Sequence, residues 1–191
     1  MQTSNVYEWT KKEDRRKKIL IALKQPLTAK QIGRRTGIST DTCSYVMTKF
    51  AAKGLVICLN PKARNSRLYW ITGVGRQCRR QLHQDLNLPE KAYDVPSVNW
   101  DIYGWVCYSH RAAIIRSMIS PMQPSEVKRV LRVHRSNIRI SANNIRDVMK
   151  LLLEKGLVQK VFVRKKAHPR YELTDSGNQF RQLLMQAESG F

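Results

Sequence analysis

Acidic residues are scarce in this sequence. Its 191 residues include 35 Lys and Arg but only 14 Asp and Glu, so the formal net charge at pH 7 is +21. Self-repulsion at this charge destabilises a compact chain unless a polyanion neutralises part of it. The excess therefore predicts nucleic acid as the partner, ahead of an anionic membrane surface and of a surface that serves only solubility.

Long apolar runs are missing too. No segment approaches the roughly 20 apolar residues that a helix needs to cross a bilayer, and residues 1–18 lack the apolar core of a signal peptide. Glycine-rich phosphate loops, carboxylate pairs in a metal-binding pattern and a GxSxG motif are also missing. We therefore expect a protein that is not an enzyme and that has no membrane partner.

Closely spaced metal ligands are a further absence. The cysteines Cys43, Cys58, Cys78 and Cys107 form no CxxC pair, and the four histidines are scattered. Structural zinc sites use closely spaced pairs of such ligands, so we expect no metal and no other cofactor. The spacing does not suggest a disulfide framework either, which predicts a reducing, cytoplasmic compartment.

The sequence does contain an internal repeat. Residues 17–32 align with 112–127 at an offset of 95, and residues 38–75 align with 140–177 at an offset of 102. The change of offset places seven additional residues in the second copy, between about 128 and 139. Such self-similarity indicates two structural units built on one plan.

Charge marks the boundary between the two copies. Residues 1–85 carry 18 bases and 5 acids, and residues 109–191 carry 16 and 6, whereas residues 86–108 carry only 1 and 3. The positive charge therefore lies on the copies and avoids their connection, which also contains two prolines. We predict a first domain, a linker and a second domain over residues 1–85, 86–101 and 102–191.

Local patterns predict the elements of the first copy. Apolar spacing indicates a helix over 15–24, which Pro26 ends. Thr28 is expected to cap a second helix that runs through Arg35, and Gly37 supplies the turn that follows. The remaining elements are a third helix from its cap Ser39 to Ala52, strands over 55–59 and 68–72 around a basic tip, and a last helix over 73–84.

The second copy repeats this order. Its expected elements are a helix over 110–119, a second helix from Pro124, a third helix capped by Ser141, hairpin strands over 157–163 and 171–174, and a closing helix to about Met185. Aromatic segments precede both copies, at 6–9 and 102–105. The predicted fold class is mainly α with small β-hairpins, within the α+β class.

Both copies share a signature around the hairpin. It reads KGLV, then a basic tip, then YxITxxG in the first copy and YxLTxxG in the second. In the first copy its residues are Lys53, Gly54, Leu55, Val56, Tyr69, Ile71, Thr72 and Gly75. In the second copy they are Lys155, Gly156, Leu157, Val158, Tyr171, Leu173, Thr174 and Gly177. This pattern resembles winged-helix transcription regulators of the MarR and PadR kind. The resemblance implies two tandem winged helix-turn-helix domains, with the third helix of each as the DNA-reading element.

The chain departs from those regulators by carrying two units. One chain would thus do what a homodimer does elsewhere, and a homodimer of this chain would bind a longer inverted repeat. Two third helices in successive major grooves would lie about 34–36 Å apart.

Helical phase identifies the side chains of the third helices that face outward. With Val46, Met47 and Phe50 inward, the outward set is Asp41, Ser44, Tyr45 and Thr48, with Thr40, Thr42 and Lys49 at its margins. The same phase in the second copy turns Asn143, Arg146, Asp147 and Lys150 outward, with Ser141 at the cap and Asn144 at the margin. Asn pairs with adenine, Arg with guanine, and Asp accepts from cytosine. The alternative is an ordinary solvated polar face.

Basic hairpin tips form the second candidate surface. Phosphate or minor-groove contact suits mobile cations there, and soluble edges are the alternative. The tip residues are Lys62, Arg64 and Arg67 in the first copy, and Arg164, Lys165, Lys166 and Arg170 in the second.

Further basic and aromatic residues fit either of two roles. The run 11–18 would lie along phosphates or would be a solvated helix start, and Arg132, His134, Arg135 and Arg139 would widen the DNA contact or shape a turn. The aromatic residues would pack the lead-in segments or stack on single-stranded bases; they are Tyr7, Trp9, Trp100, Tyr103, Trp105 and Tyr108.

Together these features predict a sequence-specific protein that binds double-stranded DNA, regulates transcription and is associated with the nucleoid in the cytoplasm. The alternatives are an initiator of replication or partition, a protein that binds structured RNA, and a protein-binding adaptor, which the net charge disfavours.

Overall fold

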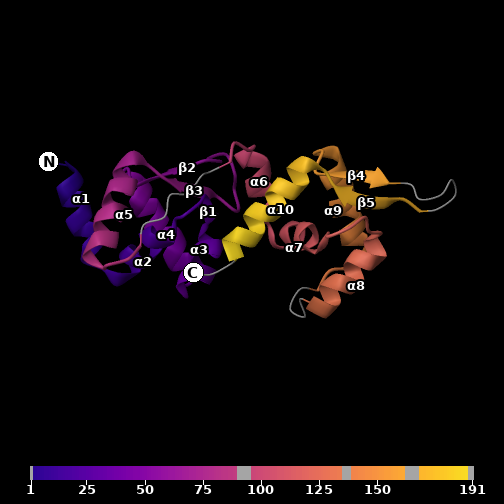
Figure 1. Cartoon of the computed structure of the whole chain (residues 1–191), viewed down its shortest axis with the longest axis horizontal. Helices are drawn as coiled ribbons and strands as arrows, with labels where there is room; N and C mark the ends of the chain where they lie inside the picture. The colour runs from indigo at the N-terminus through magenta and orange to yellow at the C-terminus, as the bar shows by residue number, and fades with distance from the viewer. Residues whose placement is uncertain (1, 90–95, 135–138, 162–167, 189–191) are drawn as a thin grey trace. The chain divides into compact units, whose positions relative to one another are not determined.

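The computed structural model describes residues 2–89, 96–134, 139–161 and 168–188 (Figure 1). About 62% of the structure is helical and the sheets are small and antiparallel, which confirms the expected mainly α, α+β class at that level. Contacts divide the chain into unit 1, residues 1–105 with 187–191, and unit 2, residues 106–186.

Unit 1 contains most of the expected first copy and two helices beside it. Its elements are α1 (Gln2–Lys11), α2 (Asp14–Ala22), β1 (Leu27–Thr28), α3 (Ala29–Thr36), α4 (Thr40–Ala52), β2 (Val56–Cys58), β3 (Leu68–Ile71), α5 (Gly73–Asp85) and α6 (Trp100–Val106). The strands form an antiparallel sheet in the order β1-β3-β2, in which Leu27 pairs with Tyr69 and Val56 with Ile71. Strand β1 was not predicted, because two residues carry no periodic signal.

Local capping explains where α3 and α4 begin. The Thr28 hydroxyl accepts from the Gln31 amide at 3.2 Å, while the Gln31 side chain accepts from the Thr28 amide at 2.8 Å. Ser39 accepts from the Thr42 amide at 3.2 Å. Each cap satisfies backbone donors that a helix start leaves without partners. Between the helices Gly37 adopts a φ of +71°, which only glycine adopts readily, so both predicted caps and the predicted turn are confirmed.

The core of unit 1 joins α2, α3 and α4 to the sheet. Ile19, Leu23, Ile32, Met47 and Phe50 are all fully buried. Burial of each such side chain stabilises the fold by roughly 1.5–3 kcal/mol relative to exposure. The side chains come from the predicted apolar stripes, so the inward face of α4 lies where its periodicity placed it.

Unit 2 repeats the order helix, helix, helix, hairpin, helix. Its elements are α7 (Ser109–Ser117), α8 (Pro124–His134), α9 (Ala142–Glu154), β4 (Val158–Val161), β5 (Arg170–Leu173) and α10 (Asp175–Glu188), of which the last two residues fall in unit 1. In place of a third strand, the Met122 and Tyr171 backbones exchange hydrogen bonds of 2.9 and 2.8 Å. The pair matches Leu27 and Tyr69 of unit 1 in the repeat.

The shared signature has a structural role in both units. The Thr72 amide donates to the Leu55 carbonyl at 3.0 Å and the Thr72 hydroxyl to the Gly54 carbonyl at 2.6 Å; Thr174 repeats this with Leu157 and Gly156 at 3.1 and 2.7 Å. A Cβ on Gly75 or Gly177 would lie 2.1 Å from the carbonyl oxygen of Leu55 or Leu157, respectively. The signature therefore fastens the closing helix to the start of the hairpin.

The second aromatic segment differs from the expected arrangement. Residues 102–105 were predicted to open the second domain, but contacts assign them to unit 1. Tyr103 is fully buried, and a Cβ on Gly104 would lie 2.1 Å from the Asn60 side-chain nitrogen. Glycine thus permits α6 to approach the hairpin of unit 1, a contact across 44 positions that composition could not predict.

Candidate nucleic-acid interface

Helix α4 presents a polar face to solvent. Asp41, Ser44, Tyr45 and Thr48 are exposed, as the helical phase predicted, and the Tyr45 side chain is 64% exposed. Thr40 and Lys49 are exposed beside them, and the Lys49 ammonium lies 5.3 Å from the centre of the Tyr45 ring. Thr42 is half-buried, and both its amide and its hydroxyl contact the Ser39 hydroxyl, so it belongs to the cap.

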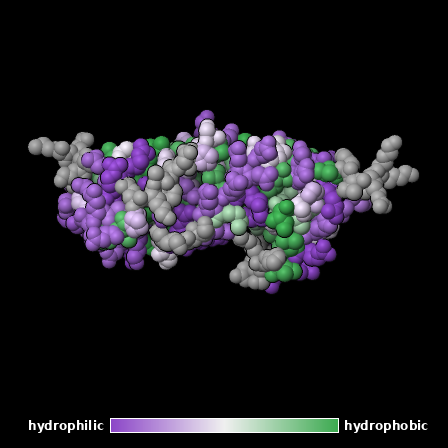
Figure 2. Space-filling view, viewed as in Figure 1, coloured by the Kyte–Doolittle hydropathy of each residue, from purple (hydrophilic) through white to green (hydrophobic). Residues whose placement is uncertain are grey.

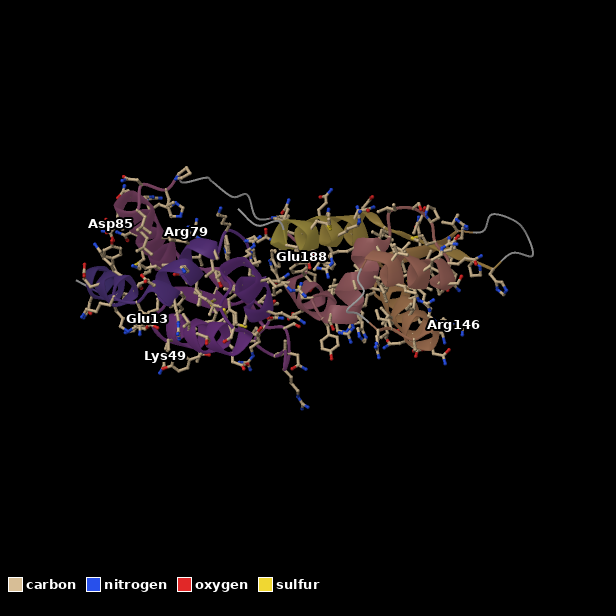
Figure 3. All side chains as sticks on the ribbon, turned by 90° about the horizontal axis from the view of Figure 1, so that it is seen from below. Glu13, Lys49, Arg79, Asp85, Arg146 and Glu188 are labelled. Carbon is tan, nitrogen blue, oxygen red and sulfur yellow. The ribbon has the colours of Figure 1, made fainter. Side chains whose placement is uncertain are left out.

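A groove of about 670 Å³ runs beside this face. Figure 3 labels Glu13 and Lys49, two of its lining residues. The full lining is Trp9, Glu13, Arg15, Arg16, Asp41, Thr42, Tyr45, Val46, Lys49 and Lys53. Four cations and two acids thus line a groove between α4 and the junction of α1 and α2.

Trp9 is packed, and this favours the packing interpretation over stacking on bases for this residue, whereas Tyr108 is 48% exposed. The Arg16 guanidinium lies 3.9 Å and the Lys53 ammonium 4.7 Å from its ring centre, and Phe50 meets it edge to face. Cations over an indole ring attract its negative face. Tyr7 and Tyr103 are buried as well.

Several cations of the basic run 11–18 have intramolecular partners. Arg16 pairs with Glu13 at 2.7 Å, Lys17 with Asp14 at 2.6 Å, and Lys11 with Asp85 at 2.6 Å. Hydrogen bonds from Lys11 and from the Tyr7 hydroxyl lower the pKa of Asp85 below its usual value. The Lys11 pair joins α1 to α5, and the other two pairs lie within α2 and its cap. Only part of the run is therefore open to a phosphate backbone.

Helix α9 presents the corresponding face in unit 2. Asn143, Arg146, Asp147 and Lys150 are exposed, while Ile145, Val148, Met149 and Leu152 are buried. The Arg146 guanidinium donates to the Asn143 side-chain oxygen at 3.1 Å. One bond of this kind reduces the rotamer freedom of a side chain that has five donors in a planar fork.

The cap residue and the margin residue of α9 act within the fold. The Ser141 hydroxyl accepts from the Asn144 amide at 3.1 Å, as the predicted cap requires. The Asn144 side chain lies 3.2 Å from the His110 ring nitrogen of α7. Asn144 therefore braces α9 against α7, whereas Arg146 and Lys150 point away from the core.

A second groove, of about 500 Å³, lies beside α9. Basic side chains of Lys128, Arg146 and Lys150, together with His168, line it alongside Pro124, Met149, Pro169 and Tyr171. None of the described residues that line this groove is acidic. These lining residues would therefore attract an anionic backbone, although the exposed Asp147 lies on the same face of α9.

The hairpin tip of unit 1 is held by a buried asparagine. Asn60 is 1% exposed, its side-chain oxygen accepts from the Leu68 amide at 2.7 Å, and its side-chain nitrogen donates to the Ser66 carbonyl at 3.2 Å. Lys62, Arg64 and Arg67 are exposed around it. The three cations thus lie on a braced loop. The Asn-Pro pair at its start was the only available sequence signal for Asn60.

The tip of unit 2 requires one correction. Arg170 was predicted among the wing cations, but it lies in β5, where its guanidinium binds the Glu126 carboxylate at 2.7 Å and the Pro121 carbonyl at 2.9 Å. It fastens the hairpin to α8. Arg164, Lys165 and Lys166 lie outside the described residues, as do Arg135 and the His134 side chain, while Arg132 and Arg139 are exposed.

Hydrophilic side chains cover much of the face of each unit that Figure 2 shows. Within the part of the chain that the structure describes, no helix is long and apolar enough to cross a membrane, and no cluster of His, Cys, Asp and Glu is suited to a metal ion. Comparison with family models, curated proteins and solved structures gave no match.

Proposed function

We propose that this chain is a sequence-specific, double-stranded DNA-binding protein and a transcription regulator, built from two tandem winged helix-turn-helix units. In each unit the three helices of the repeat precede a hairpin and a closing helix; they are α2, α3 and α4 in unit 1 and α7, α8 and α9 in unit 2. The last of the three has one buried and one polar, exposed face. A helix of this kind fits the major groove, where each base pair shows a distinct pattern of donors and acceptors.

The observation that carries the proposal is the exposed face of α9. Arg146 (Figure 3) and Lys150 are exposed beside a groove in which none of the described lining residues is acidic, and Asn143 accepts a hydrogen bond from the Arg146 guanidinium. A planar fork can donate two hydrogen bonds to guanine O6 and N7, the commonest specific contact in the major groove.

The hairpins would act as wings on the DNA backbone or in the minor groove. Lys62, Arg64 and Arg67 are exposed on the braced tip of unit 1. Their contacts would supply affinity that is independent of sequence and weakens with salt. The net charge of +21 supports this use of the surface.

The test is a titration of random duplex DNA, single-stranded DNA and structured RNA at several salt concentrations, followed by selection from a randomised duplex pool. We expect the chain to bind duplex DNA more tightly than single-stranded DNA or structured RNA. The selection should enrich an asymmetric motif, because the exposed faces of α4 and α9 differ. Arg146→Ala should relax one position by about 1–3 kcal/mol of discrimination.

Arg146→Lys is the matched control, because it keeps the charge and removes the fork. It should lose less discrimination than Arg146→Ala, because an ammonium can still donate to guanine, while it keeps the salt dependence of the wild type. Preferential binding of RNA or single strands would overturn the proposal. An initiator of replication or partition would use the same duplex contacts, and the genes beside its own would distinguish it from a regulator.

A further inference from the structure

Two neighbouring side chains on α4 do not suit a surface that binds only phosphates. The Asp41 carboxylate is exposed and has no hydrogen-bond or ion-pair partner among the described residues. Tyr45, one helical turn further on, has the most exposed aromatic side chain in that part of the chain, at 64%. Both line the groove of unit 1, among the cations Arg15, Arg16, Lys49 and Lys53.

An unpaired carboxylate limits what this face can bind. A phosphate would repel Asp41, so bound DNA would be accommodated either by a neighbouring cation of the groove or by a hydrogen-bond donor of the DNA. No cation of the described residues pairs with Asp41, which favours the donor. In the major groove only the N4 amino group of cytosine and the N6 amino group of adenine are donors. Adenine also presents its N7 acceptor beside N6, which would repel a second carboxylate oxygen, whereas cytosine presents a C5–H beside N4. Cytosine is therefore the better partner of Asp41.

Tyr45 lies where it can contact the remaining edge of the same base. Residues four apart on a helix have Cβ atoms about 5–6 Å apart and share one face. The Lys49 ammonium lies 5.3 Å from the centre of the Tyr45 ring. From there it would bind a phosphate of the DNA backbone beside the base. An aromatic ring beside the C5 edge favours a methyl group there, as apolar contacts with thymine do.

We infer that Asp41 and Tyr45 together read the major-groove edge of a cytosine in the half-site of unit 1. Asp41 accepts a hydrogen bond from N4, and Tyr45 packs against C5. This assignment rests on the proposed function, and it makes the affinity of unit 1 sensitive to methylation of that cytosine.

A purely structural role for Asp41 is the competing explanation, because an acid in the first turn of a helix interacts favourably with the helix dipole. Unit 2 speaks against it. The position equivalent to Asp41 is Asn143, and α9 forms with no acid in its first turn. The position equivalent to Tyr45 is Asp147, so unit 2 lacks the pair altogether.

The first experiment is selection from a randomised duplex pool with the wild-type chain and with Asp41→Asn. Asn pairs with adenine through N6 and N7, so the position that the wild type selects as cytosine should become adenine, with a change in preference of roughly tenfold. The matched control is Asp175→Asn, which removes an exposed acid from the first turn of α10 and should still select cytosine.

The second experiment measures binding of the selected duplex with cytosine or 5-methylcytosine at that position. The wild type and Tyr45→Phe should bind the methylated duplex about fourfold more tightly, the factor that corresponds to burial of one methyl group. Tyr45→Ala should lose this difference.

An unchanged base preference of Asp41→Asn, with the duplex still bound, would overturn the inference alone. Absence of specific duplex binding by the wild type would overturn the proposed function together with it.

Discussion

Substitution of Gly75 by Ala tests whether the closing helix really meets the hairpin as the structure shows. The added Cβ would lie 2.1 Å from the Leu55 carbonyl oxygen and 2.6 Å from Ile71 Cγ1. The same oxygen accepts from the Thr72 amide at 3.0 Å and from its hydroxyl at 3.2 Å. Relief of the contact must displace backbone and weaken both bonds.

The expected cost is the difference of two opposing effects. Overpacking costs about 1–3 kcal/mol, and two weakened hydrogen bonds cost about 1 kcal/mol each. Replacement of glycine by alanine inside a helix contributes about 1 kcal/mol in the opposite direction. Gly75→Ala should therefore lower the free energy of unfolding by about 2–4 kcal/mol, and lower Tm by roughly 8–30 °C for a unit of this size.

Tryptophan fluorescence is the suitable signal, because all four tryptophans belong to unit 1. Gly73→Ala is the matched control, since no atom lies within 4 Å of a Cβ at that position of the same helix. It should leave stability unchanged or raise it by up to about 1 kcal/mol. Equal unfolding midpoints in urea for the two variants would refute the close contact between α5 and the hairpin.

Three further predictions concern charged side chains. Arg170→Ala should destabilise unit 2 by about 1 kcal/mol, because its guanidinium bridges Glu126 and the Pro121 carbonyl. Circular dichroism during urea unfolding measures this change. Arg170→Ala should leave the slope of log affinity for duplex DNA against log salt concentration unchanged, whereas Lys62→Ala should lower the magnitude of that slope by about 1. Hydrogen bonds from Lys11, and to a smaller extent from Tyr7, lower the pKa of Asp85 in the folded chain. The carboxylate therefore stabilises the fold at pH values above its pKa in the unfolded chain, about 3.9. This stabilisation is lost as the pH falls through the pKa of the folded chain. The urea midpoint of the wild type should thus exceed that of Asp85→Asn near neutral pH and converge with it in acid, and a difference that persists in acid would contradict this role.

Features that depend on neighbours in the chain could be predicted from the sequence. The Thr28 and Ser39 caps bond to amides three residues ahead, and the turn at Gly37 needs only one residue with a positive φ. The repeat predicted the equivalent cap of α9 at Ser141, whose hydroxyl accepts from the Asn144 amide. The outward face of α4 followed from a helical period alone, because burial of Val46, Met47 and Phe50 determines which side chains remain outside.

Contacts between distant residues could not be predicted. Arg170 was grouped with the tip because of its position in a basic run, but its partner Glu126 is 44 residues away. The Asn144 side chain likewise meets His110, 34 residues earlier. The sequence of a loop between two predicted strands does not show whether a polar side chain is exposed, as that of Lys62 is, or buried and hydrogen-bonded, as that of Asn60 is. Only the folded arrangement separates these cases.

The difference between the two exposed faces leads to a final prediction about how the units divide their task. Asn143 and Arg146 of α9, which share a hydrogen bond of 3.1 Å, are replaced by Asp41 and Ser44 at the equivalent positions of α4. Because Asp41 and Ser44 are exposed, the double substitution Asp41→Asn with Ser44→Arg should transplant the pair without loss of stability, which thermal unfolding checks.

The transplanted pair should make the half-site selected by unit 1 resemble that of unit 2, and the enriched duplex should become more symmetric. The reciprocal double substitution, Asn143→Asp with Arg146→Ser, should instead remove the preference of unit 2 and leave that of unit 1 intact. Base choice at a half-site is a difference of affinities. If the exposed side chains of a helix determine that difference, their transfer to the other helix must transfer the base preference. If both double variants select the wild-type sequence, the two helices do not read the DNA, and the affinity of the chain for nucleic acid must come from its other basic surfaces.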